Sequence, residues 1–338
     1  MHKAVRTFKA TMVEARFLPL IVSLGVLAMR AAMYLAHGAP TTSYADTGFL
    51  WHYVSPFFSN PDVSFVANTA SVFCIAWLLS RLNNVFSLIR TRTHLPYVIP
   101  LFLFSLHPYF LAMTPDYISV ILILFAFFPL LHSYQQPVAQ VYSFQSSVLI
   151  GLASLFQLFA LFLLPLWWRG ESSMRGIRAK SLLSSLLGII LIYLSVFSVY
   201  FLFDDIPGFV SRFLHMADAS LPALPDFSML QWGFLTAVFL LFVLIMFFSI
   251  RTYTRDKVLT LSTMQFMVFL LVFLIAFQIV YWNKTLFFLV LGIALLSCLI
   301  AYFYTITTHK THIYAAYGVI SLLIAFYFVN YFSLLSFM

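Results

Sequence analysis

The chain has 338 residues, of which 63% are hydrophobic and 8% charged, and its formal net charge is +8. A soluble domain of this length cannot bury so much apolar surface, so the composition excludes an ordinary soluble protein and predicts contact with lipid. The positive charge lies between apolar runs, where it indicates membrane orientation rather than a nucleic-acid partner. Cys74 and Cys298 lie inside apolar runs and suggest neither a disulfide framework nor a metal site.

The N-terminal segment is basic and precedes a long apolar run without a clean cleavage site, so we interpret this run as an uncleaved first span. Because lipid cannot satisfy open backbone groups, the spans should be α-helices, which predicts an all-α polytopic membrane protein. Nine apolar runs are long enough to cross a bilayer, near residues 17–36, 65–82, 95–113, 117–134, 181–203, 228–250, 258–281, 285–305 and 313–334.

The stretch 146–168 is longer than one span needs and too short for two. It is followed by a basic segment, 169–180, which a single crossing would place outside, against the positive-inside rule. Two half-length helices hinged near Gln157 would return the segment to the cytoplasm; each would measure roughly 16 Å, about half of the bilayer core. The sequence therefore predicts a re-entrant hairpin, with one long tilted span as the alternative.

With this hairpin and a cytoplasmic N-terminus, the charged residues separate into two groups. Of the 18 basic residues, only Arg30, Arg212 and Lys284 fall in the outer half, which leaves 15 inside. Most acidic residues fall outside. The predicted topology is therefore nine full spans plus the hairpin, with the N-terminus cytoplasmic and the C-terminus outside.

Two outer loops, 37–64 and 204–227, are long enough to build a site. The first contains the aromatic, amphipathic stretch "FLWHYV", and the second has an apolar stripe opposite a polar stripe that includes Arg212 and His215. Both patterns are typical of helices that lie in the headgroup layer. We expect the two loops to pack together and form the rim of one cavity, which would suit a substrate with a lipid tail and a polar head.

Four outer acidic residues are candidate site residues. Asp116 follows Thr-Pro and so falls in the first turn of a span, where a carboxylate is stabilised by unpaired N–H groups. Asp204 and Asp205 come at the C-terminal end of a span, where the helix dipole disfavours them, so another interaction must hold or use them. Asp46 either caps the stretch that follows it or stands free in the first outer loop.

The three outer basic residues are candidates for holding a phosphate. Arg30 lies about two turns inside the first span, where snorkelling to the interface is the simpler interpretation. Lys284 lies in the turn "YWNKT", where it would anchor a span end. Other polar partners are available on the outer face, of which an intramembrane histidine is more often a packing residue than a ligand: His52, His107, Asp204, Asp205 and His215.

Several segments together resemble a known fold. The first outer loop carries "SYADTGF", a span ends in "WLLSRLNN", the next pair reads "LPYVIPLFLFSLHPYFLAMTPDYISVILILFAF", and "VLIGLASLFQLFALFLLPLWWR" follows. This order resembles the N-terminal half of the GT-C membrane glycosyltransferases over about residues 15–205. The chain also resembles a family of bacterial polytopic inner-membrane proteins, a likeness that names no activity.

The GT-C resemblance implies transfer of a sugar from a polyprenyl-phosphate donor, with an acidic residue of the first outer loop in catalysis. In this chain Asp46 would be the general base and Asp116 the second candidate, while cations such as Arg212 and Lys284 would stabilise the phosphate. One base with direct displacement would invert the anomeric centre. No cofactor is required, although a divalent ion bridging Asp46 and the phosphate is conceivable. The chain lacks an Asp-Glu pair at Asp46 and a basic residue after "GLASLF".

Two other functions remain open. A non-catalytic subunit of a cell-envelope assembly would use its spans to dock other envelope membrane proteins and keep Asp46 as a helix cap. A lipid or small-molecule transporter would need ionisable groups across the bilayer, and the apolar runs after residue 228 contain almost none. We divide the chain into a GT-C-like module, 1–205, and a C-terminal part, 206–338, and expect membrane lipids as partners and no nucleic acid. The predicted location is the bacterial inner membrane.

Overall fold

The structure is a computed structural model, and it describes residues 3–38, 48–89, 91, 93–136, 140–176, 178–217, 236, 257–281, 284–307 and 309–335. Asp46 and nearly all of the predicted span 228–250 lie outside these residues. The described part of the chain is helical and contains no strand. Its elements are α1 (Lys3–Phe8), the π-helix η1 (Lys9–Val13), α2 (Leu18–His37), α3 (Trp51–Val54), η2 (Ser55–Phe58), α4 (Pro61–Phe86), α5 (Leu95–Leu103), η3 (Pro108–Phe110), α6 (Pro115–His132), α7 (Gln140–Phe156), η4 (Leu158–Phe162), α8 (Leu163–Arg175), α9 (Ala179–Leu202), α10 (Ile206–Ala217), α12 (Val258–Val280), α13 (Phe287–Ile306) and α14 (Lys310–Leu335).

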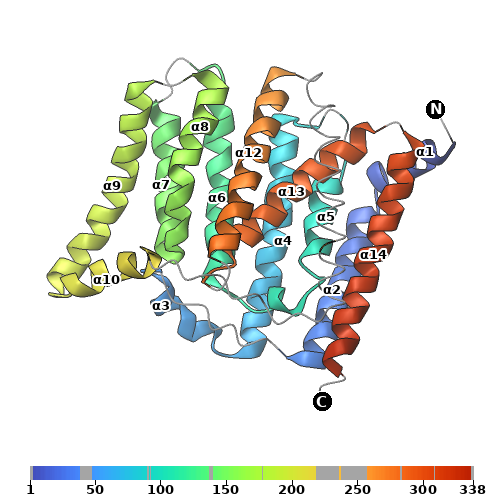
Figure 1. Cartoon of the computed structure of the whole chain (residues 1–338), viewed down its shortest axis with the longest axis horizontal. Helices are drawn as coiled ribbons and strands as arrows, with labels where there is room; N and C mark the ends of the chain where they lie inside the picture. Colours follow the sequence, from blue (N-terminus) through green and yellow to red (C-terminus); the bar gives the residue numbers. More distant parts are fainter. Residues whose placement is uncertain are drawn as a thin grey trace.

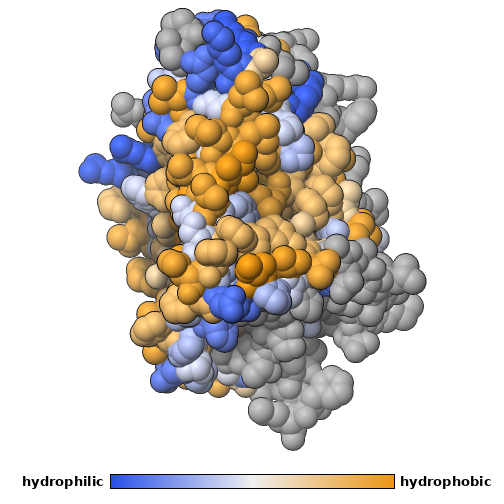
Figure 2. Space-filling view, turned by 90° about the vertical axis from the view of Figure 1, so that its left-hand side faces the viewer, coloured by the Kyte–Doolittle hydropathy of each residue, from blue (hydrophilic) through white to orange (hydrophobic). Residues whose placement is uncertain are grey.

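Seven of the described helices are long and apolar enough to cross a membrane: α2, α4, α6, α9, α12, α13 and α14. They match seven of the nine predicted spans to within a few residues. Most of them run between the same two ends of the molecule, whereas α13 crosses the others obliquely (Figure 1). On one face, hydrophobic side chains form a band between more hydrophilic ends (Figure 2). The protein is therefore a multi-pass helical membrane protein.

One hydrophobic core joins helices from both predicted parts of the chain, because α13 packs against α4, α5, α6 and α12. By contrast, α9 lies at the edge of the molecule and buries few residues of its own. It approaches α7 closely at Gly188, where an added Cβ would lie 2.2 Å from the Ser147 hydroxyl oxygen. The start of α1 and the end of α14 lie at opposite ends of the molecule (Figure 1). Which end is cytoplasmic stays a prediction.

The predicted span 95–113 is wrong, because the helix α5 stops at Leu103. Beyond it the chain follows an irregular path that contains only η3 and leads directly to α6. Pro100 lies inside α5 and Pro108 begins η3. Each proline removes a backbone donor. An apolar run of 19 residues has the composition of a span, so hydropathy could not reveal the break.

Buried polar side chains satisfy the irregular segment after α5. Arg30 donates hydrogen bonds to the carbonyl oxygens of Phe104 and Phe110, both at 2.9 Å. The Asn68 amide donates to the Ala112 carbonyl at 2.7 Å. Arg30 is fully buried, so the expectation that it snorkels to the interface is wrong. The cost of leaving carbonyls unpaired in an apolar interior explains why its guanidinium turns inward.

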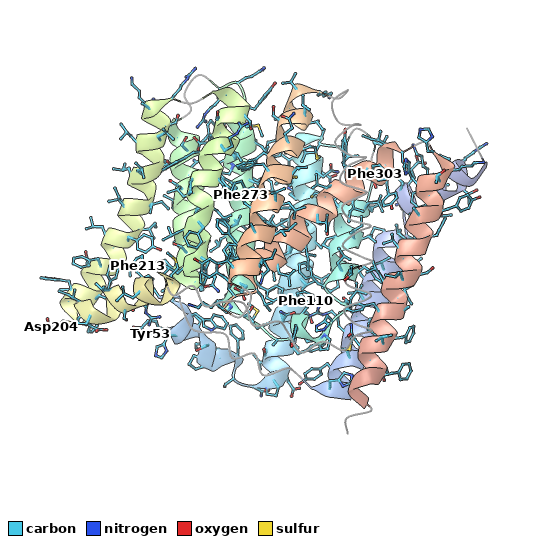
Figure 3. The ribbon with its side chains drawn as sticks, viewed as in Figure 1. Tyr53, Phe110, Asp204, Phe213, Phe273 and Phe303 are labelled. Atoms are coloured by element: carbon cyan, nitrogen blue, oxygen red, sulfur yellow. The ribbon has the colours of Figure 1, made fainter. Side chains whose placement is uncertain are left out.

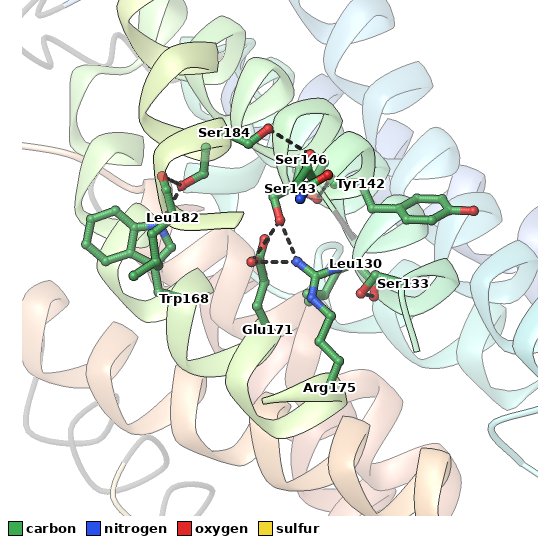
Figure 4. A network of polar contacts seen from close by, with 12 residues as sticks. Leu130, Ser133, Tyr142, Ser143, Ser146, Trp168, Glu171, Arg175, Leu182 and Ser184 are labelled. Carbon is green, nitrogen blue, oxygen red and sulfur yellow. Dashed lines mark hydrogen bonds and ion pairs between the residues drawn. The ribbon is translucent and has the colours of Figure 1, made fainter. Parts of the chain in front are cut away.

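The predicted reversal of the chain is observed: α7 ends at Phe156, the chain turns at Gln157 and η4, and α8 returns. That the pair re-enters from one side of the membrane stays a prediction. The free ends of the hairpin are joined, since Ser143 Oγ donates to Glu171 Oε2 at 2.9 Å and Arg175 Nη2 donates to the same oxygen at 2.8 Å (Figure 4). A single long span is thereby excluded.

The hairpin is longer than predicted, because α7 begins at Gln140 and α8 continues to Arg175. At about 1.5 Å per residue, the 17 residues of α7 measure about 25 Å rather than half of a bilayer core. The helix α7 includes polar residues before the apolar run, such as Ser143 and Ser146, and both are buried.

Candidate functional site

The tip of the hairpin, which we define as residues 155–157, is the point where the candidate site is assembled. Gln157 has extended backbone angles and separates α7 from η4. Its side chain is buried, and its Nε2 donates to Asp116 Oδ1 at 2.8 Å and to Thr285 Oγ1 at 2.9 Å. The tip therefore contacts the start of α6 and the turn that precedes α13.

The end of the first outer loop lies against the tip. The Leu50 N–H donates to the Leu155 carbonyl at 2.9 Å. Gly48 approaches so closely that an added Cβ would lie 2.0 Å from the Phe156 carbonyl oxygen. Only glycine fits this contact without a shift of the backbone. Asp46 lies outside the described residues, two positions before this contact.

The helix α10 covers the same segment from its other side. Arg212 donates to the Gly48 carbonyl, and its guanidinium lies 5.6 Å from the centre of the Phe49 ring. Phe49 also packs against Phe209 and Phe213, with ring centroids 5.3 and 5.7 Å apart. The predicted packing of the two outer loops is confirmed for their described parts, and Figure 3 shows Phe213 and Tyr53 at this end of the molecule. The predicted cavity between the loops stays a prediction.

Asp116 is fully buried in the first turn of α6, as expected from its sequence position. Besides the Gln157 amide, it accepts a hydrogen bond from Thr285 Oγ1 at 2.9 Å and from Thr114 Oγ1 at 3.0 Å. The N-terminus of α6 adds the favourable end of the helix dipole. Lys284, which directly precedes Thr285, is half-buried in the turn between α12 and α13.

Asp204 and Asp205 are both exposed and end α9 with a left-handed turn. The Asp204 and Asp205 N–H groups donate to the carbonyls of Phe201 and Tyr200, which is the Schellman arrangement. Asp205 Oδ1 then accepts from the Gly208 N–H at 3.0 Å and caps α10. The cap of α10 accounts for the Asp205 carboxylate, whereas Asp204 contributes to the turn through its backbone.

The structure does not bring the remaining candidates to the tip. Arg30 lies in the cluster that supports the segment after α5. His107 belongs to that segment, where its Nδ1 accepts from the Tyr109 N–H at 3.3 Å and its ring stacks on Phe326. His52 is exposed on α3, and His215 lies on α10 with a side chain outside the described set.

The tip thus gathers segments that carry four predicted site residues: Asp46, Asp116, Arg212 and Lys284. Gly48 and Thr285 were missed by the sequence reading, although a glycine two residues after a candidate acid and a threonine directly after a candidate lysine were visible signals. In the described part of the chain, no group of three His, Cys, Asp or Glu side chains is placed to hold a metal ion. No protein-family model, curated protein or solved structure matches this chain.

Proposed function

We propose that this multi-pass membrane protein is a glycosyltransferase that transfers a sugar from a polyprenyl-phosphate donor to an acceptor of the cell envelope. The proposed location is the bacterial inner membrane, with the site on its outer face at the hairpin tip. One observation carries the proposal: the tip contacts Gly48, two residues after Asp46, while Arg212 donates to that same glycine. Arg212 and the hairpin tip therefore meet at Gly48, two positions after the candidate base in the sequence.

The proposed chemistry needs one base and one cation. Asp46 removes the proton from the acceptor hydroxyl, and the hydroxyl oxygen forms a bond to the anomeric carbon of the sugar. The bond from that carbon to the phosphate oxygen breaks, and its electron pair leaves with polyprenyl phosphate. Arg212 stabilises the phosphate charge, with Lys284 as the second cation. Attack opposite the leaving group inverts the anomeric centre.

The order of the early spans supports the proposal through its resemblance to the GT-C fold. The arrangement of Arg212 adds to it, because a guanidinium that is fixed on Gly48 and the Phe49 ring keeps further N–H groups for an anion. A lipid-linked substrate could reach this place along the membrane, since α9 and α10 beside it expose apolar side chains such as Leu202, Val210 and Leu214.

The test is the substitution Asp46→Asn, measured as transfer of labelled sugar from polyprenyl phosphate in membranes that contain the variant. Loss of a general base lowers transfer by roughly two to four orders of magnitude. Asp62→Asn is the matched control, because Asp62 is an exposed acid at the start of α4 that accepts from Tyr34. A well-expressed Asp46→Asn protein with full transfer and full complementation of a deletion strain would refute the proposal.

A non-catalytic subunit of an envelope assembly is the second candidate. The observation that favours it is that the side chains of Arg30, Asp116 and Asp205 each serve the fold through hydrogen bonds within the protein. Under this function Asp46 would cap a helix, and its loss would cost about 1 kcal/mol of stability while complementation is kept. The same Asp46→Asn experiment therefore separates the two functions.

A further inference from the structure

The hydrogen bonds around Asp116 determine where the protons lie. Thr285 Oγ1 accepts from the Phe287 N–H at 3.0 Å and from Gln157 Nε2 at 2.9 Å, so its own proton is directed to Asp116 Oδ1. Thr114 Oγ1 donates to the other carboxylate oxygen. Asp116 Oδ1 therefore accepts from both Thr285 and Gln157, and the carboxyl group is held by three side chains.

An acceptor hydroxyl cannot reach Asp116 as it would reach a general base. A base must reach the acceptor hydroxyl within hydrogen-bond distance, directly or through one water. Asp116 has no exposed surface, and neutral donors from three segments of the chain surround it. Its contacts are all made to the protein itself.

We propose that Asp116 is a positioning residue that fixes the hairpin tip, and through the tip fixes Gly48 and Leu50, the described residues that follow Asp46 in the chain. The catalytic part of this inference rests on the proposed function. Asp116 holds Gln157 and Thr285; the tip holds Gly48 and Leu50 through its backbone. The same hydrogen bonds among Asp116, Gln157 and Thr285, which we call the lock, position Lys284, because this residue directly precedes Thr285 in the chain.

The structure offers a matched comparison for this lock. Ser119, on the same helix as Asp116, donates to the Ala153 carbonyl of α7 at 2.8 Å and is equally buried. Ser119→Ala removes a bond between α6 and α7 but leaves the side chains of Asp116, Gln157 and Thr285 paired, and the Ala153 carbonyl keeps the Gln157 N–H. Thr285→Val removes a donor to Asp116 and keeps the side-chain shape, whereas Thr285→Ser keeps the hydroxyl.

The experiment measures the position of the tip directly. Leu50→Cys and Leu155→Cys are introduced together in a full-length chain in which Cys74 and Cys298 are replaced, and the pair is bridged with a short bismaleimide in membranes. Because the two backbones are hydrogen-bonded, the parent pair should react rapidly. Thr285→Val should lower the bridging rate about tenfold, the effect of leaving one buried acceptor without its donor. Ser119→Ala and Thr285→Ser should keep the rate within about twofold of the parent.

The outcomes separate this inference from the proposed function. Membrane levels are compared first, and Gln157→Leu serves as a second variant that breaks the lock from the other side. Unchanged bridging in Thr285→Val and Gln157→Leu would overturn the inference whatever the transfer rate. Lowered bridging together with full activity of Asp46→Asn would support the positioning role of Asp116 and contradict the proposed glycosyltransferase activity. Lowered bridging with a parallel loss of sugar transfer, absent in Ser119→Ala, is the expected result.

Discussion

Replacing Arg30 by lysine should destabilise the protein, although the charge is kept. The guanidinium donates to four oxygens, those of the Phe104 and Phe110 carbonyls and of the Asn68 and Thr69 side chains. These oxygens come from two different segments, and the donors that reach them are spread over a planar fork. A lysine ammonium is a compact group and cannot replace the planar set of guanidinium N–H donors.

The magnitude follows from the bonds that are lost. If lysine keeps two of the four, the other two cost about 1.5 to 3 kcal/mol each, or about 3 to 6 kcal/mol together. With about 2 °C of melting temperature for each kcal/mol in a chain of this size, the expected decrease is about 6 to 12 °C. Such a loss exceeds the effect of most single substitutions.

Cys298 provides the assay, because it is buried inside α13 and becomes reactive only when the helices separate. A thiol-reactive fluorescent dye in detergent then reports unfolding of a Cys74→Ser chain on heating. Arg81, exposed on α4, supplies the control: Arg81→Lys should shift the melting temperature by less than about 1 °C. An Arg30→Lys protein that melts within about 1 °C of the parent would refute the role assigned to the guanidinium.

Two further predictions concern the hairpin. Gly48→Ala places a Cβ 2.0 Å from the Phe156 carbonyl oxygen and should displace the loop from the tip, which slows bridging between cysteines at Leu50 and Leu155. Gly25→Ala is the control, because an added Cβ there has open space around it and should leave the bridging rate unchanged. A cysteine at Ser173, near the free ends of the hairpin, should react with a membrane-impermeant thiol reagent only after permeabilisation, while one at Asp204 should react in intact cells. Labelling of Ser173→Cys in intact cells would place that end of the hairpin outside and reverse the predicted topology.

The sequence predicted best what depends on composition alone. A helix such as α6 needs only a start signal, here a proline and an acid in its first turn, and an apolar run of sufficient length, and both are visible in the printed residues. The hairpin was also predictable, because charge bias constrains the side on which basic segments lie. The end of α5 was not, since the residues after Leu103 stay apolar and the hydrogen bonds that replace the helix come from Arg30 and Asn68, far away in the chain.

The site shows the same limit. Asp116 was expected in the first turn of a helix, and it lies there. Its partner Gln157 was expected only as a hinge, and the other partner, Thr285, comes from a turn 169 residues away in sequence. Such contacts arise from the packing of the hairpin against α6 and α13, so no local pattern could predict them.

Two buried polar clusters, around Arg30 and around Asp116, perform a similar physical task on different parts of the chain. Each supports backbone that is not helical inside an apolar protein, which is tolerated only where protein or a wet cavity surrounds it. The Arg30 cluster is enclosed by membrane helices, since its oxygens come from α4 and the segment after α5, and Asn330 of α14 binds the Leu106 carbonyl beside it. The Asp116 cluster supports the tip. The tip contacts Gly48, and Gly48 binds Arg212 of the amphipathic helix α10. The second cluster connects buried polar groups with Gly48, two residues after Asp46, and with Arg212, which is why the catalytic proposal belongs at the hairpin tip.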